Sequence, residues 1–149
     1  MHAFVLQDWT TIRGGSGIAT INQSEHEWHS LDGYQDLIAW IDIREASLGG
    51  PATFIQFNLQ TAPIKDENLF VNMEPTPLTV SAALTTPSVR KVILANSNTY
   101  TVPLGKWVRW QLVAGNSVPT STWDATFRIL LCANPLGGGG GGAMHHRQR

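Results

Sequence analysis

Hydrophobic and polar residues alternate with a period of two in three segments of the chain. Ile55, Phe57 and Leu59 alternate with polar residues, and the segments 107–113 and 125–133 repeat this pattern. Because successive side chains of a strand point to opposite faces, each segment predicts a strand with one face in a core and the other towards solvent.

Further short apolar segments follow at the spacing expected of a sandwich or barrel. We predict strands at residues 3–6, 10–13, 17–22, 27–31, 37–44, 53–60, 78–84, 89–95, 99–102, 107–113 and 125–133. Gly, Pro, Asn and Asp, the residues that favour tight turns, separate them. The predicted fold class is therefore all-β: an antiparallel, jelly-roll-like β-sandwich with at most one short helix.

Two segments leave alternatives open. Residues 34–45 could form an amphipathic helix capped by Asp32, but the nearly continuous apolar run from Leu37 to Ile41 favours a strand buried on both faces. Residues 65–73 predict a short helical turn with acidic residues near its start, placed as a lid over one end of the sandwich.

The composition excludes a disordered chain and argues against a general nucleic-acid binder. Hydrophobic residues make up 42% of the 149 residues, charged residues only 14%, and the net charge is −1. Residues 1–74 hold three basic and ten acidic groups, whereas residues 75–149 hold seven basic groups and one acidic group. If the two halves formed separate faces, the domain would be dipolar and suited to docking on copies of itself or on a charged partner.

The single cysteine, Cys132, excludes an internal disulfide and is expected to be a small buried hydrophobe. The N-terminus lacks the basic and apolar regions of a secretory signal. The sequence also holds no run of about twenty apolar residues, so we expect no membrane partner. We expect the protein to fold in a cytoplasm.

The C-terminal segment differs in character from the rest of the chain. Six consecutive glycines at 137–142 precede Ala-Met-His-His-Arg-Gln-Arg, and polyglycine forms a flexible tether. We therefore divide the chain into a β-sandwich domain at 1–136 and a flexible arm at 137–149, although an artificial extension is an alternative reading. The residues expected to contact neighbouring subunits through this arm and the N-terminal strand are Met1, His2, Phe4, Gly137, Gly140, Met144, His145, His146, Arg147 and Arg149.

No cluster of residues predicts a catalytic, cofactor or metal site. His26 and His29 are three residues apart, and on a strand they would point to opposite faces. The chain has no Gly-x-Ser-x-Gly elbow, and Gly14–Gly17 lacks the lysine and helix of a phosphate-binding loop. Carboxylate pairs for glycoside chemistry could be drawn from Asp36, Asp42, Asp66 and Glu67, with no spacing that favours any pair.

Six tryptophans allow two interpretations. Trp40 and Trp110 lie inside apolar runs and are expected to fill the core. Trp28, Trp107 and Trp123 lie beside polar residues or turns. They could form an exposed platform that stacks on sugar rings, although burial in the core or at a subunit interface is the favoured interpretation.

The chain as a whole resembles the small β-sandwich cement or decoration proteins of tailed bacteriophage heads. The resemblance rests on the Thr-, Asn- and Ser-rich body, the absence of a signal, the terminal arm, and the segments Gln35-Asp-Leu-Ile-Ala-Trp-Ile-Asp and Trp123-Asp-Ala-Thr-Phe-Arg-Ile-Leu-Leu. It implies a non-enzymatic structural protein that binds the major capsid protein or other virion subunits, forms a dimer or trimer, and needs no cofactor. The implied location is the virion, assembled in the host cytoplasm, without direct contact to nucleic acid.

Two other functions stay open at this stage. A carbohydrate-binding module, for example on a phage tail or in a host-surface system, would expose coplanar tryptophans. A hydrolase would bring His26 or His29 to an acidic residue in a cleft.

Overall fold

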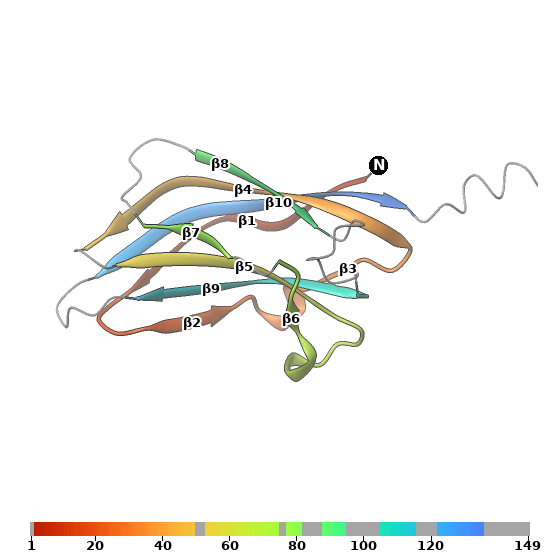
Figure 1. The fold of residues 1–149 in the computed structure, drawn as a ribbon, viewed down its shortest axis with the longest axis horizontal. Coiled ribbons are helices and arrows are strands. Elements are labelled where there is room, and N and C mark those ends of the chain that lie inside the picture. Colours follow the sequence, from red (N-terminus) through yellow and green to blue (C-terminus); the bar gives the residue numbers. More distant parts are fainter. Residues whose placement is uncertain are drawn as a thin grey trace, which may run out of the picture.

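Two antiparallel sheets pack face to face in the computed structural model, which describes residues 2–49, 53–74, 77–81, 88–94, 105–115 and 122–135 (Figure 1). Sheet A has the order β1-β10-β4-β8, made of β1 (His2–Gly14), β10 (Trp123–Pro135), β4 (Tyr34–Leu48) and β8 (Ser88–Leu94). Sheet B has the order β2-β9-β5-β6, made of β2 (Ala19–Asn22), β9 (Trp107–Gly115), β5 (Phe54–Ala62) and β6 (Val71–Asn72). Two short strands complete sheet B: β3 (His29–Ser30) pairs with β9, and β7 (Leu78–Val80) pairs with β5.

The chain crosses repeatedly between the two sheets. It runs from β1 in sheet A to β2 in sheet B, returns to β4, crosses to β5, and later passes through β8 and β9 to end in β10. This exchange of strands between two antiparallel sheets is the jelly-roll arrangement. The predicted all-β, jelly-roll-like sandwich is therefore confirmed, and residues 34–45 form a strand, not a helix.

The strand boundaries differ from the prediction where the chain bulges or turns. Residues 3–6 and 10–13 belong to one strand, β1, whose register shifts on both sides of Gln7. Residues 27–31 are not one strand, because the 3-10 turn η1 (Glu25–Glu27) precedes the two residues of β3. The strand predicted at 99–102 and the ends of those predicted at 78–84 and 89–95 lie outside the described residues.

The predicted helical turn within 65–73 is present as a second 3-10 turn, η2 (Glu67–Leu69). Asp66 caps it by accepting a hydrogen bond from the backbone N–H of Asn68 at 2.9 Å. This turn lies beside β9 on the outer face of sheet B, where Glu67 contacts Arg109, and not over an end of the sandwich.

The core lies between the inner faces of the two sheets. Trp110 of β9, as predicted, is buried there, and Phe127 of β10 meets its ring and that of Phe57 edge to face at centroid distances of 5.3 and 4.9 Å. These edge-to-face contacts contribute beyond the burial of apolar area. The remaining large, fully buried side chains are Leu31, Leu37, Ile41, Ile43, Ile55, Met73, Leu112, Trp123, Ile129 and Leu131.

Gln23 links the two sheets at the end of β2. Its buried side chain donates to the carbonyl of Leu6 in β1 at 2.6 Å and accepts from the N–H of Trp110 in β9 at 3.3 Å. Leu6 lies where the register of β1 shifts, so it has no partner in the pairing with β10. The amide of Gln23 thus provides the hydrogen bond that the irregular strand lacks.

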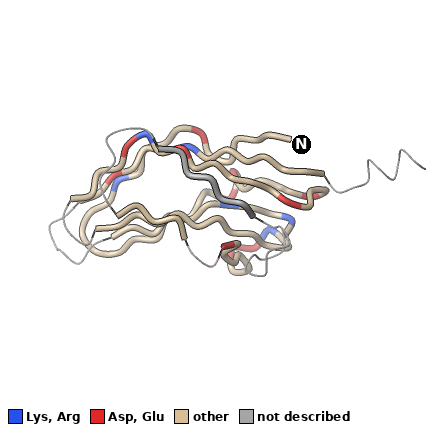
Figure 2. Tube along the Cα trace, turned by 45° about the horizontal axis from the view of Figure 1, so that its top comes forward, with Lys and Arg blue, Asp and Glu red and all other residues tan. Residues whose placement is uncertain are grey.

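Basic and acidic residues both occur along the strands and turns of the two layers (Figure 2). Arg128 of β10 pairs with Asp42 of β4 at 2.9 Å, so a basic residue of the second half of the chain lies beside an acidic residue of the first half. The jelly roll interleaves the two halves. The uneven charge along the sequence therefore does not produce a separate acidic and basic face among the described residues.

The N-terminal segment is a strand within the sheet. His2 pairs with Ala133 and Phe4 pairs with Leu131 of β10, and Phe4 packs against the core. His2 and Phe4 are therefore part of sheet A, and their expected contact with neighbouring subunits stays a prediction. Met1 and the predicted arm at 137–149 lie outside the described residues, and no described helix is long and apolar enough to cross a membrane.

Candidate functional site

Apolar side chains of β1, β10 and β4 form a band on the outer face of sheet A. Leu130 of β10 is paired on one side with Val5 of β1 and on the other with Trp40 of β4. In the next row, Cys132 is paired with Ala3 and Ile38. Val5 is 57% exposed, and the side chains of the two central strands are half-buried. We call these six residues the apolar band.

Polar rows border the apolar band at both ends. On one side Asn134 donates a hydrogen bond to Asp36 at 3.0 Å. On the other side Arg128 donates to Asp42 at 2.9 Å. An apolar centre with a polar border is the usual anatomy of a protein interface, so this face is the first candidate for a binding surface.

Trp9 of β1 lies beside the pair formed by Arg128 and Asp42. Its ring is 37% exposed and lies under two guanidinium groups, with Arg44 at 4.5 Å and Arg128 at 4.8 Å from the ring centroid. Cation–π contacts of this kind hold arginine side chains flat against the sheet. Trp9 was not among the predicted site residues, although it occupies an odd position of β1, like the outward-facing Ala3 and Val5.

The outer face of sheet B carries a ladder of amide side chains. Gln111 of β9 donates to Asn22 of β2 at 2.9 Å and accepts from Asn58 of β5 at 3.2 Å. Gln60 donates to Asn72 of β6 at 2.8 Å. These bonds satisfy the amides among themselves, which makes the ladder a structural network.

Arg109 is buried next to this ladder. Its Nε donates to Gln60 at 2.8 Å, and its guanidinium lies 4.2 Å from the ring centroid of Phe70 and 5.4 Å from that of Trp28. Burial lowers the pKa of Arg109, and the carboxylate of Glu67, 3.6 Å away, acts in the opposite direction. The alternation of β9 places Arg109 on the solvent side, and sequence reasoning missed that the two 3-10 turns cover it.

The predicted tryptophan platform is absent from the fold. Trp28 and Trp123 are 8% and 2% exposed, because Trp28 packs edge to face on Phe70 and Trp123 belongs to the core. Trp107 is half-buried, with the Lys65 ammonium 5.1 Å from its ring centroid. The favoured interpretation, burial, is therefore confirmed for Trp28 and Trp123, and the carbohydrate-binding alternative loses its main support.

The burial predictions for Trp40 and Cys132 are wrong. Trp40 and Cys132 were expected in the core, but both lie half-buried on the outer face of sheet A. In this part of β4 and β10, successive side chains point to opposite faces of the sheet. Ala39, Ile41 and Leu131 therefore occupy the inner face, and Trp40 and Cys132 the outer one.

The acidic residues and histidines considered as catalytic candidates do not come together in a catalytic arrangement. His26 is exposed in η1, whereas His29 packs on Phe4 at a centroid distance of 4.5 Å, and burial lowers its pKa. Asp36, Asp42, Asp66 and Glu67 bind Asn134, Arg128, the backbone of η2 and Arg109, respectively. Across the described ranges, no three His, Cys, Asp or Glu side chains gather as a metal site requires.

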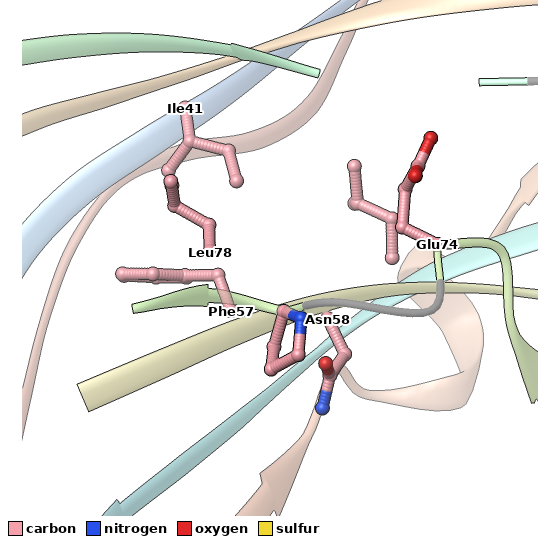
Figure 3. A pocket seen from close by; sticks show the side chains of 7 residues that line it. Ile41, Phe57, Asn58, Glu74 and Leu78 are labelled. Atoms are coloured by element: carbon pink, nitrogen blue, oxygen red, sulfur yellow. The ribbon is translucent and has the colours of Figure 1, made fainter. Parts of the chain in front are cut away.

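A small cavity lies between the sheets beside β7 (Figure 3). Ile41, Phe57 and Leu59 line it with Asn58, Pro77 and Leu78, and burial raises the pKa of the Glu74 carboxyl beside it. Its volume of about 20 Å³ has room for one water and is far below the several hundred Å³ of ligand sites. This cavity is therefore too small for a small-molecule ligand.

No family model and no curated protein matches the sequence, but the fold is similar to solved virus structures. The infectious bursal disease virus VP2 subviral particle matches with a TM-score of 0.55 over 87% of this chain at 12% identity. The chain has a viral capsid-like β fold. The structure of the Gx strain of the same virus matches with a TM-score of 0.54 over 91% of the chain at 10% identity. The chain spans about a third of the matched chains, 33% and 32% of their lengths.

Proposed function

We propose that this capsid-like domain is a structural, non-enzymatic virion protein that binds other virion subunits. The supporting observation is the jelly-roll fold, which matches the structures of infectious bursal disease virus over 87% and 91% of the chain. Because one fold can serve many functions, the surface also matters. The apolar band with its polar border suits protein contact better than small-molecule binding.

Within the virion, we propose a cement or decoration role on a bacteriophage capsid. A rigid sandwich with a broad interaction face can bridge neighbouring shell subunits. The sequence of residues 137–149 suits a flexible arm that orders on binding, which adds contact area at a cost in conformational entropy. The proposed partners are the major capsid protein or other shell subunits.

Density-gradient sedimentation of particles tests the virion role. If the role is correct, the chain sediments with the shell in a fixed ratio to its main protein. A chain that stays at the top of the gradient, with intact particles below, would refute the proposal.

A gene deletion separates decoration from shell building. Particles that assemble without the protein and lose their DNA at a lower temperature support a decoration role. Failure to form any particle indicates a shell component instead.

Removal of residues 137–149 tests the arm. We expect the truncated protein to occupy fewer sites than the full chain at equal concentration. Equal occupancy would show that the arm is not used.

A further inference from the structure

The two central strands of sheet A carry complementary pairs along their outer face. Successive rows across β10 and β4 are Arg128 with Asp42, Leu130 with Trp40, Cys132 with Ile38, and Asn134 with Asp36. The first row is an ion pair, the two middle rows are apolar, and the last is an amide–carboxylate hydrogen bond. In each row, the residue on one strand is therefore a suitable partner for the residue on the other.

We propose that two copies of this chain pack through the outer faces of their sheets A, around a twofold axis that runs parallel to the strands between β4 and β10. Such an axis exchanges the two strands, so each residue of a row faces the partner's copy of its own cross-strand neighbour. Arg128 then faces the partner's Asp42, and Leu130 faces the partner's Trp40. The twofold interface repeats each of these contacts twice.

Charge selects this axis over the perpendicular one. A twofold axis perpendicular to the strands, through the centre of the apolar band, would place β4 opposite the partner's β4. The two β4 strands would then run in opposite directions. The Asp42 row and the Asp36 row lie at equal distances from that centre, so Asp42 would face the partner's Asp36. Like charges opposed across an interface are unfavourable, whereas the axis parallel to the strands opposes unlike charges.

The size of the face sets the expected strength of association. Four strands spaced about 4.8 Å apart, over eight residues of about 3.4 Å each, give a face of about 19 by 27 Å. Two such faces cover about 1,000 Å², which is the lower limit for a specific interface. We therefore expect a weak dimer that dissociates on dilution.

The sequence of the central strands gives independent support. Residues Leu37–Ile41 and Ile129–Ala133 are continuously apolar, a pattern typical of strands covered on both faces. Sheet B covers the inner face, and no described element packs on the outer face. A second copy supplies the missing cover. This inference rests on the surface of the domain and does not require the proposed virion role.

Sedimentation velocity of the full chain between 1 and 200 µM tests the dimer. We expect a concentration-dependent shift from monomer to dimer. Leu130→Glu should weaken dimerisation at least tenfold, because it places a carboxylate in the apolar centre. The matched control is Leu69→Glu, which changes an exposed leucine of η2 and should leave dimerisation unchanged.

A charge exchange tests the axis itself. Arg128→Asp leaves two acidic residues in the row, and Asp42→Arg leaves two basic ones, so each variant alone should be monomeric. Mixed in equal amounts, the two variants should form a heterodimer, because every facing pair is then of opposite charge. Thermal melts establish that each variant is folded before mixing.

Three results would overturn the proposal: a monomeric wild type at 200 µM, a dimer that Leu130→Glu and Leu69→Glu affect equally, or folded charge variants that stay monomeric when mixed. If the wild type is monomeric, the partner that covers the outer face of sheet A is a different protein.

Discussion

Replacing Gln23 by methionine should destabilise the fold by about 3 kcal/mol. The two side chains have similar volume, so the core keeps its packing. The substitution removes the hydrogen bonds to the carbonyl of Leu6 and the N–H of Trp110. Both backbone groups then stay buried without these partners, because Gln23 itself is only 3% exposed.

The magnitude follows from the cost of an unsatisfied buried polar group. Each such group costs about 1–3 kcal/mol, and two of them give about 2–6 kcal/mol. We take the lower half of that range, since the Trp110 bond is long at 3.3 Å and the strand ends can adjust. For a domain of this size, a loss of about 3 kcal/mol lowers the melting temperature by about 10 °C.

Urea unfolding followed by tryptophan fluorescence measures the difference. Gln35→Met, at an exposed position of β4, is the control and should change stability by less than about 0.5 kcal/mol. If Gln23→Met and Gln35→Met unfold at the same urea concentration, the link between the sheets through Gln23 contributes nothing, and the reasoning is refuted.

Two further predictions concern β1 and His29. Gly14→Ala should destabilise the fold by about 1–3 kcal/mol, because the added Cβ would overlap the buried indole of Trp123, whereas Gly15→Ala meets open space and should be neutral in thermal melts. Burial lowers the pKa of His29 below its ordinary 6.5, so the unfolded chain binds the proton more readily and stability should fall as the pH drops below about 6.5. Comparing melting temperatures at pH 7.5 and 5.0, His29→Phe should show a smaller loss than wild type, and His26→Phe, an exposed control, should keep the full loss.

The fold could be predicted because its signal is local. The alternation of Ile55, Phe57 and Leu59 with polar residues fixes which side of β5 faces the core, and the structure buries all three. The strand boundaries could be predicted less well, because the register shifts that make β1 one long strand depend on its pairing with β10.

The binding surface could be predicted only in part. The apolar run from Leu37 to Ile41 indicated burial on both faces, but the sequence does not say what covers each face. Trp40 was therefore assigned to the core of the domain, although it lies on the outer face of sheet A. Arg109 shows the reverse error, since turns distant in sequence cover a position that alternation assigns to solvent.

The position of β10 has a consequence for how the protein is made. This last strand lies between β1 and β4 in the middle of sheet A. Until residues 123–135 have been synthesised, β1 and β4 have no common neighbour, and the core lacks the six buried hydrophobic residues of β10. The pairing of β1 with β10 joins residues more than a hundred positions apart, and contacts of such long sequence separation form slowly. The growing chain must therefore be protected from aggregation until β10 has been synthesised.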